Sequence, residues 1–351
     1  MKVKLGMYLF PVLMAGLLLA GCSENMQGQP ADMKKQIDAE LGSIERITVL
    51  STDGVEVPLE LPTFLKELTE QGSDLQKSDQ PLAREEIRYT LVLYRAKLAP
   101  LVVEIGEQAS QYGENTYRGQ GAVKFYQWIY KQAGVGLLSG TYRSTVLSAV
   151  DLNQTLTLDK DQTFAVQEVL VTAEPLMEKE RHQYPLYPYY QMRVDTGERM
   201  LDATLLTPTM IAVPFGRETQ YYRIQGSLFS QFTQWMPPRK MTDDSFQQLY
   251  QAATIRLIAT GAEAKGSVEK KSTETTVEQG MAHHCVRLLK NSTLLSQEPK
   301  NHGAEKYQLS FAVGDTVHTV YFYDRFFRYQ ENWYAQDKLE EEIFRLLGSK
   351  K

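Results

Sequence analysis

Three stretches of the chain show the same succession of apolar and polar positions. Each opens with a short alternating or β-branched run, which predicts a half-buried strand, at 43–50, 144–150 and 253–259. A second β-rich run then starts at a tyrosine, at Tyr89, Tyr190 and Tyr307. Stripes of apolar residues at helical spacing follow 36, 39 and 36 residues after these tyrosines and predict core helices. The near-constant spacing predicts repeated units.

The helix patterns differ in how clearly they begin and end. In the first closing helix, Phe125, Trp128 and Ile129 share one face, and Gly134 stands where a C-cap would end it. The last closing helix is expected at 337–348. The stretch 164–177 stays open between helix and strand, because its valines favour a strand and a proline interrupts it.

Together these patterns predict an α+β fold made of two or three repeated modules of about 100 residues. Each module is expected to be an antiparallel sheet with packed helices, at 36–135, 140–238 and 243–348. The alternative is one mixed α+β domain in which the aromatic helices resemble one another by chance. The regular strand–helix alternation of a parallel sheet is not evident.

The N-terminus carries an export signal. Lys2 and Lys4 precede an uncharged apolar run from Leu5 to Ala20. This run contains Pro11 and is shorter than the roughly 20 apolar residues that a membrane-spanning helix needs. A plain transmembrane anchor is therefore the weaker interpretation.

The signal ends in Leu19-Ala20-Gly21-Cys22, which resembles the lipobox of bacterial lipoproteins. The resemblance implies that the Cys22 thiol receives a diacylglycerol carrying fatty acids such as palmitate. It also implies that residues 1–21 are removed and that the chain is anchored on the extracytoplasmic side of the cell membrane. Two acyl chains on one cysteine hold a protein stably at a bilayer. Residues 22–35 are expected to form a flexible tether.

The net charge of the chain limits the classes of partner it can bind, and its cysteine count limits the disulfides it can form. The chain has 351 residues, and removal of Lys2 and Lys4 with the signal leaves 36 basic against 43 acidic side chains, a net charge of −7. This balance excludes a strongly basic nucleic-acid-binding protein and disfavours anionic lipid as a ligand. Once Cys22 is lipidated, Cys285 is the single remaining thiol, so an intramolecular disulfide cannot form.

The sequence nominates no catalytic residue, cofactor or metal site. The S-x-x-K match at 267–270 lies in a polar, lysine-rich stretch, which favours a solvated loop. His283, His284 and Cys285 are adjacent on a predicted helix, where their side chains diverge too far to share one ion. The chain is therefore expected not to be an enzyme, although dispersed catalytic residues stay possible.

Two aromatic segments are candidate binding surfaces. Tyr187 and Tyr189 lie in the proline-containing segment 184–190, which is expected to be an extended loop that a partner could contact. Phe327 and Trp333 lie in paired strands with aromatic residues on both faces. One face would fill the core and the other could stack on sugar rings or peptide, the alternative being that both serve stability alone.

These observations predict a lipid-anchored extracytoplasmic protein that binds another envelope component, a protein or a glycan, without catalysis. One alternative is a solute-binding lipoprotein that serves a transporter. Another is an envelope hydrolase with dispersed catalytic residues.

Overall fold

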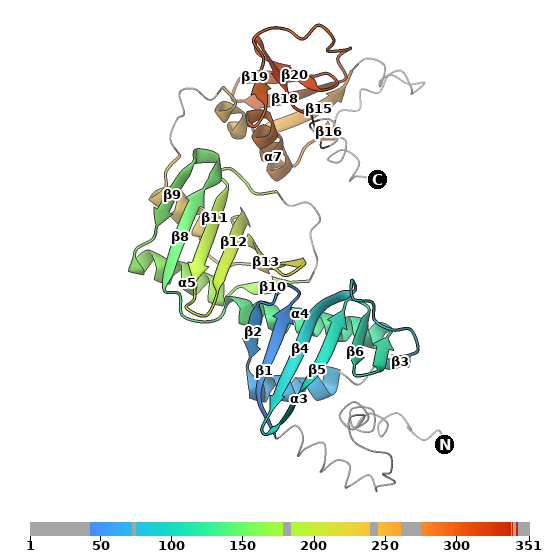
Figure 1. The fold of residues 1–351 in the computed structure, drawn as a ribbon. Helices are drawn as coiled ribbons and strands as arrows, with labels where there is room; N and C mark the ends of the chain where they lie inside the picture. The colour runs from blue at the N-terminus through green and yellow to red at the C-terminus, as the bar shows by residue number, and fades with distance from the viewer. Residues whose placement is uncertain are drawn as a thin grey trace, which may run out of the picture.

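The computed structural model describes residues 43–71, 75–177, 184–238, 245–260 and 275–337, together with Leu339 and Glu342. This part of the chain forms three antiparallel sheets of seven strands each and five α-helices (Figure 1). The expected α+β fold is confirmed. The signal, Cys22, the tether, the 267–270 stretch and most of the predicted last helix lie outside the described residues.

Sheet A contains the first seven strands in the order β2-β1-β4-β5-β6-β7-β3. The strands are β1 Ile44–Ser51, β2 Glu56–Leu59, β3 Gln76–Ser78, β4 Ile87–Arg95, β5 Leu98–Gly106, β6 Ala109–Tyr112 and β7 Asn115–Arg118. The helices are α3 Leu61–Gln71 and α4 Gln120–Leu138. Alternate residues such as Ile47 and Leu91 point into a core to which both helices contribute.

Sheet B has the order β10-β14-β13-β12-β11-β8-β9. The strands are β8 Ser144–Ala149, β9 Gln154–Thr157, β10 Glu174–Leu176, β11 Tyr190–Asp195, β12 Met200–Thr207, β13 Met210–Phe215 and β14 Glu218–Arg223. Its helices are α5 Lys160–Val171, α6 Leu228–Trp235 and the 3₁₀ turn η3 Val150–Leu152. A capping box between Asp159 and Gln162 starts α5, so the ambiguous stretch 164–177 contains helix first and then β10.

Sheet C has the order β16-β15-β18-β19-β20-β21-β17. The strands are β15 Thr254–Ala259, β16 Thr275–Thr276, β17 Thr293–Leu294, β18 Tyr307–Val313, β19 Thr316–Phe322, β20 Phe326–Tyr329 and β21 Asn332–Ala335. Its helical elements in the described residues are the 3₁₀ turn η4 Gln247–Gln251 and α7 Gln279–Lys290.

Numbered along the chain within each sheet, the seven strands have the same spatial order, 2-1-4-5-6-7-3. Tyr89, Tyr190 and Tyr307 all lie in the fourth strand, which pairs with the opening strand, and all three are buried. The expected opening strands are therefore present as β1, β8 and β15.

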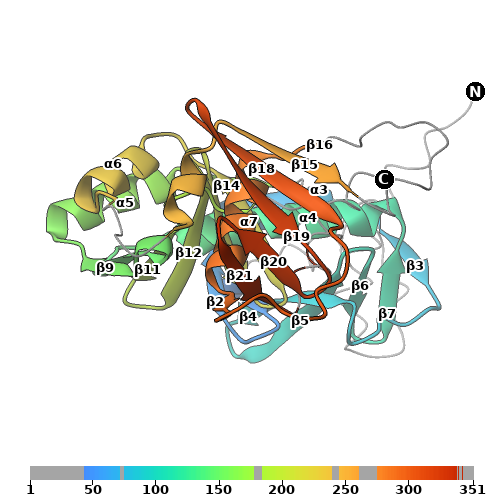
Figure 2. The same cartoon turned by 90° about the horizontal axis from the view of Figure 1, so that it is seen from above.

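Sheet B lies between the other two sheets in Figure 1, and sheet C lies nearest the viewer in Figure 2. Sheets A and B share one apolar core, whereas sheet C has a core of its own. Helix α4 joins the first two, because it contacts both β2 and β10. Gly134 is inside α4 rather than at its end, which corrects the C-cap prediction: a Cβ there would lie 2.9 Å from Pro175 Cγ. This glycine permits the close approach of β10.

Candidate functional site

A buried carboxylate lies where sheets A and B meet. The Glu218 side chain at the start of β14 is 3% exposed and accepts hydrogen bonds from the hydroxyls of Tyr89 and Tyr126. Arg88 Nε lies 3.5 Å from Glu218 Oε1 and 3.1 Å from Glu107 Oε1. Burial and the Glu218 charge raise the pKa values of Tyr89 and Tyr126 far above the usual range. Both phenols therefore stay protonated and act as donors.

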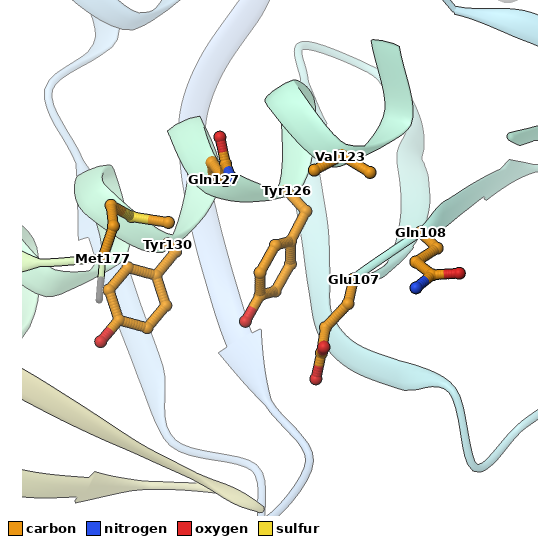
Figure 3. Close-up of a pocket in the computed structure, with 7 residues that line it drawn as sticks. All are labelled: Glu107, Gln108, Val123, Tyr126, Gln127, Tyr130 and Met177. Atoms are coloured by element: carbon orange, nitrogen blue, oxygen red, sulfur yellow. The ribbon is translucent and has the colours of Figure 1, made fainter. Parts of the chain in front are cut away.

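A hollow of about 400 Å³ opens beside this network (Figure 3). Tyr126 and Tyr130 project into it from successive turns of α4, with Glu107 next to Tyr126 and Met177 next to Tyr130. Burial raises the pKa of Tyr130 to about 12, so its hydroxyl is also neutral. The hollow offers hydrogen-bonding groups for a small polar solute, and its phenols are poor candidates for a general base.

Glu218→Gln is expected to lower the free energy of unfolding by about 1–3 kcal/mol, because one charged acceptor of a buried network is lost. Denaturant titration with fluorescence detection measures the change. Glu107→Gln is the matched control, since Glu107 contacts the same Arg88 but its side chain is 48% exposed. A change within about 1 kcal/mol is expected there. Equal losses for the two variants would contradict the structural role of Glu218.

A second hollow, of about 480 Å³, lies on one face of sheet B. Helix α6 covers the opposite face, where Phe229 and Phe232 contact the ring of Tyr190. Along β11, exposed Gln191 and Arg193 alternate with buried residues and so point away from α6. Their partners on β12 are Thr204 and Asp202. We call this surface the open face and define it by Ser148, Gln191, Arg193, Asp202 and Thr204.

Of the sequence-predicted binding residues, Tyr189 lies at the edge of the open face. Its hydroxyl accepts a hydrogen bond of 2.6 Å from Gln191 Nε2, and its backbone N–H donates to Asp151. Tyr187 lies instead between the sheet B and sheet C units, where its ring stacks on Tyr250 at 4.1 Å. The segment 184–190 therefore has two parts. Its first part, which includes Tyr187, connects the sheet B and sheet C units and is called the strap below. Tyr189, near its end, borders the open face.

The strap is held by a buried ion pair between η3 and α7. Arg287 Nε and Nη2 lie 2.8 and 2.9 Å from the two carboxylate oxygens of Asp151. The side chains are 13% and 3% exposed, respectively. Arg287 also donates to the backbone oxygens of Pro185 and Leu186 at 2.7 and 3.0 Å. These contacts link η3 and the segment 184–190 to α7, so they join the sheet B unit to the sheet C unit.

Phe327 and Trp333 lie on opposite faces of their paired strands. Phe327 is fully buried and stacks on Tyr334, so it is a core residue and lacks the exposure that a binding surface needs. Trp333 is 8% exposed and packs against His302 and Tyr323. Phe327 thus lies on the face that fills the core, and binding by this aromatic stretch stays a prediction.

His283, His284 and Cys285 diverge on α7 as their spacing predicts. His283 accepts the backbone N–H of Tyr187, His284 stacks on Tyr184, and Cys285 is buried in the core. Among the described residues, no group of three or more His, Cys, Asp or Glu side chains is arranged to hold a metal ion.

Sequence reasoning did not nominate the open face, Glu218 or the Asp151–Arg287 pair. The open face had a visible signal, the alternation of Tyr190, Gln191, Met192 and Arg193, in which the polar set faces outward. Glu218 and Asp151 had no such signal. The Tyr126 hydroxyl that donates to Glu218 is 92 residues away in the chain, and the Arg287 guanidinium that pairs with Asp151 is 136 residues away.

A scan against protein-family models, a search of curated proteins and a search of solved structures each find no match to this chain. Within the described ranges, no helix combines the length and apolarity required to cross a membrane.

Proposed function

We propose that this protein is a lipid-anchored, extracytoplasmic binding protein that contacts another envelope component through the open face, without catalysis. The open face carries the proposal, because it is a hollowed, polar surface held by strands and left uncovered by α6. The resemblance of residues 19–22 to a lipobox supports the anchor. A rigid sheet presents such a surface with little loss of entropy on binding.

We further propose that the three sheet units are repeated modules that arose by duplication, with the bounds 36–135, 140–238 and 243–348. Their common strand order and the buried tyrosine in each fourth strand support this. Repeated units suit a protein that extends from a membrane tether toward its partner.

The pairing of buried acids supports a binding function over catalysis. Glu218 accepts two phenol hydrogen bonds and Asp151 is paired with Arg287, so both carboxylates serve as links between units. A general acid or base would need access to a substrate.

The anchor is tested by Cys22→Ser. We expect the variant to be released from the membrane or to accumulate as an unprocessed precursor, because a thioether cannot form without the thiol. Membrane fractionation followed by mass spectrometry of the N-terminal peptide measures this outcome. A normally lipidated, mature form of the variant in the membrane would contradict the proposal.

Binding at the open face is tested by site-specific photo-crosslinking in the native membrane. A photoreactive residue at Thr204 should capture an envelope component, whereas one at Thr319 on β19 of sheet C serves as the control. Reproducible capture from position 204 alone supports the proposal. Equal capture, or none, from the two positions would refute a partner at the open face.

The hollow in Figure 3 favours a second candidate function, the capture of a small polar solute for a transporter. A ligand that binds the native state raises the thermal midpoint. A screen of small polar solutes would therefore reveal such a ligand as a shift that Tyr126→Phe reduces.

A further inference from the structure

We propose that the open face binds a neutral glycan chain laid across the strands of sheet B. This inference rests on the proposed function and names the chemical class of the partner.

The first argument is the arrangement of hydrogen-bonding groups. Ser148, Gln191 and Thr204 lie opposite one another on β8, β11 and β12, so they form a row across three adjacent strands. Neighbouring strands are about 4.7–4.9 Å apart, a repeat close to the length of one sugar ring. Hydroxyl and amide side chains both donate and accept hydrogen bonds, as sugar hydroxyls do. A glycan crossing the strands would meet one such group at each strand.

The second argument is charge. A parallel row on the same face pairs Arg193 with Asp202, whose Nε and Oδ1 atoms are 2.8 Å apart. The two charges cancel, so the face offers no net attraction to a polyanion or a polycation. The net charge of −7 on the mature chain further disfavours anionic polymers. Neither the cancelled charges of the face nor the net charge of the chain weakens the binding of a neutral polyhydroxyl ligand.

The third argument is that the face lacks the residue types typical of a protein–protein interface. The centres of protein interfaces are enriched in aromatic residues and methionine. Here the outward-facing central side chains are polar or charged, and the apolar Val146 and Pro214 flank them. Met192 and Ala203 also line the hollow, but they are only 1% and 2% exposed. The hollow of about 480 Å³ falls in the size range of ligand sites, about 300–1,000 Å³.

The border of the face supplies an aromatic ring. The Tyr189 hydroxyl is held by Gln191 Nε2, and its ring lies 5.2 Å from the Arg287 guanidinium. Both contacts hold the ring beside Gln191, the middle member of the polar row. A tyrosine fixed in this way can pack against the apolar face of a sugar and accept a hydrogen bond.

The test uses the mature, lipidated protein in detergent and a pentamer of β-1,4-linked N-acetylglucosamine as the probe. Titration calorimetry should show binding that the double variant Gln191→Ala, Thr204→Val weakens at least tenfold. The matched control is Gln308→Ala, Thr319→Val on the corresponding strands of sheet C, which should bind as the unmodified protein does. Circular dichroism melting verifies that both variants fold. Dextran sulfate, an anionic polymer, should not compete.

Two results would overturn the inference: no binding of the pentamer by the unmodified protein, or equal weakening by the two double variants. Mass spectrometry of the product captured from position 204 shows whether only the glycan inference has failed or the proposed function has failed as well. A captured protein without glycan refutes the glycan inference and leaves envelope binding in place. Failure to capture anything refutes both.

Discussion

Asp151→Ala is expected to lower the free energy of unfolding by about 3–5 kcal/mol and to loosen the attachment of the sheet C unit. The substitution leaves the buried Arg287 guanidinium, 13% exposed, without its carboxylate partner. It also removes the acceptor of the Tyr189 N–H at the start of β11. Denaturant unfolding gives the energy, and hydrogen exchange of α7 locates the loosened region.

The exposed ion pair of Arg193 and Asp202 provides the matched control for this prediction. Its side chains are 63% and 61% exposed, although the Nε–Oδ1 distance of 2.8 Å equals that of the buried pair. Asp202→Ala is therefore expected to change the unfolding energy by no more than about 1 kcal/mol. If Asp151→Ala costs no more than Asp202→Ala, burial of the first pair is irrelevant to stability and the predicted junction role is wrong.

Hydrophobic periodicity was sufficient to predict the strands that carry the core. The opening strands β1, β8 and β15 and the buried tyrosines of β4, β11 and β18 follow from local alternation, because side-chain direction along a strand depends only on position. Local sequence gives the wrong prediction at Gly134. A glycine near the end of an apolar stripe suggests a helix cap, but here it makes room for Pro175 of β10.

The junctions between units could not be predicted, since their partners are distant in sequence. Tyr187 was recognised as part of an extended aromatic segment, yet the acceptor of its N–H, His283, is 96 residues further on. Arg287 and Asp151 are separated by 136 residues. Only the folded chain shows that one stretch, 184–190, serves a junction at Tyr187 and the edge of an open polar face at Tyr189.

Acidification is expected to weaken this junction through His283. The Tyr187 N–H donates to His283 Nδ1 at 2.8 Å, and Nε2 lies 3.2 Å from the Tyr250 carbonyl oxygen. The ring must therefore be neutral with its proton on Nε2. Burial, together with the positive charge of Arg287, lowers the pKa of His283 to about 4. The hydrogen bond to the Tyr250 carbonyl and the charge of Asp151 raise this pKa, but by less.

The sign of the effect follows from proton binding. The unfolded chain takes up a proton at this histidine near pH 6.5, whereas the folded chain does so only near pH 4. Stability from His283 is therefore complete above about pH 6.5 and is lost as the pH falls toward 4. The difference in pKa corresponds to about 3 kcal/mol. Denaturant titrations from pH 7.5 to 4 measure how steeply the free energy of unfolding changes with pH.

His283→Gln should remove this component, because glutamine does not titrate in that range. The difference in slope between the unmodified protein and the variant isolates His283 from the carboxylates that also titrate in acid. His302→Gln replaces a histidine that packs on Trp333, away from the strap, and serves as the control for a histidine substitution elsewhere in the chain. A slope unchanged by His283→Gln would show that the Tyr187–His283 contact does not depend on the neutral ring. The strap would then be held against acid by the Asp151–Arg287 pair and by the stacking of Tyr187 on Tyr250.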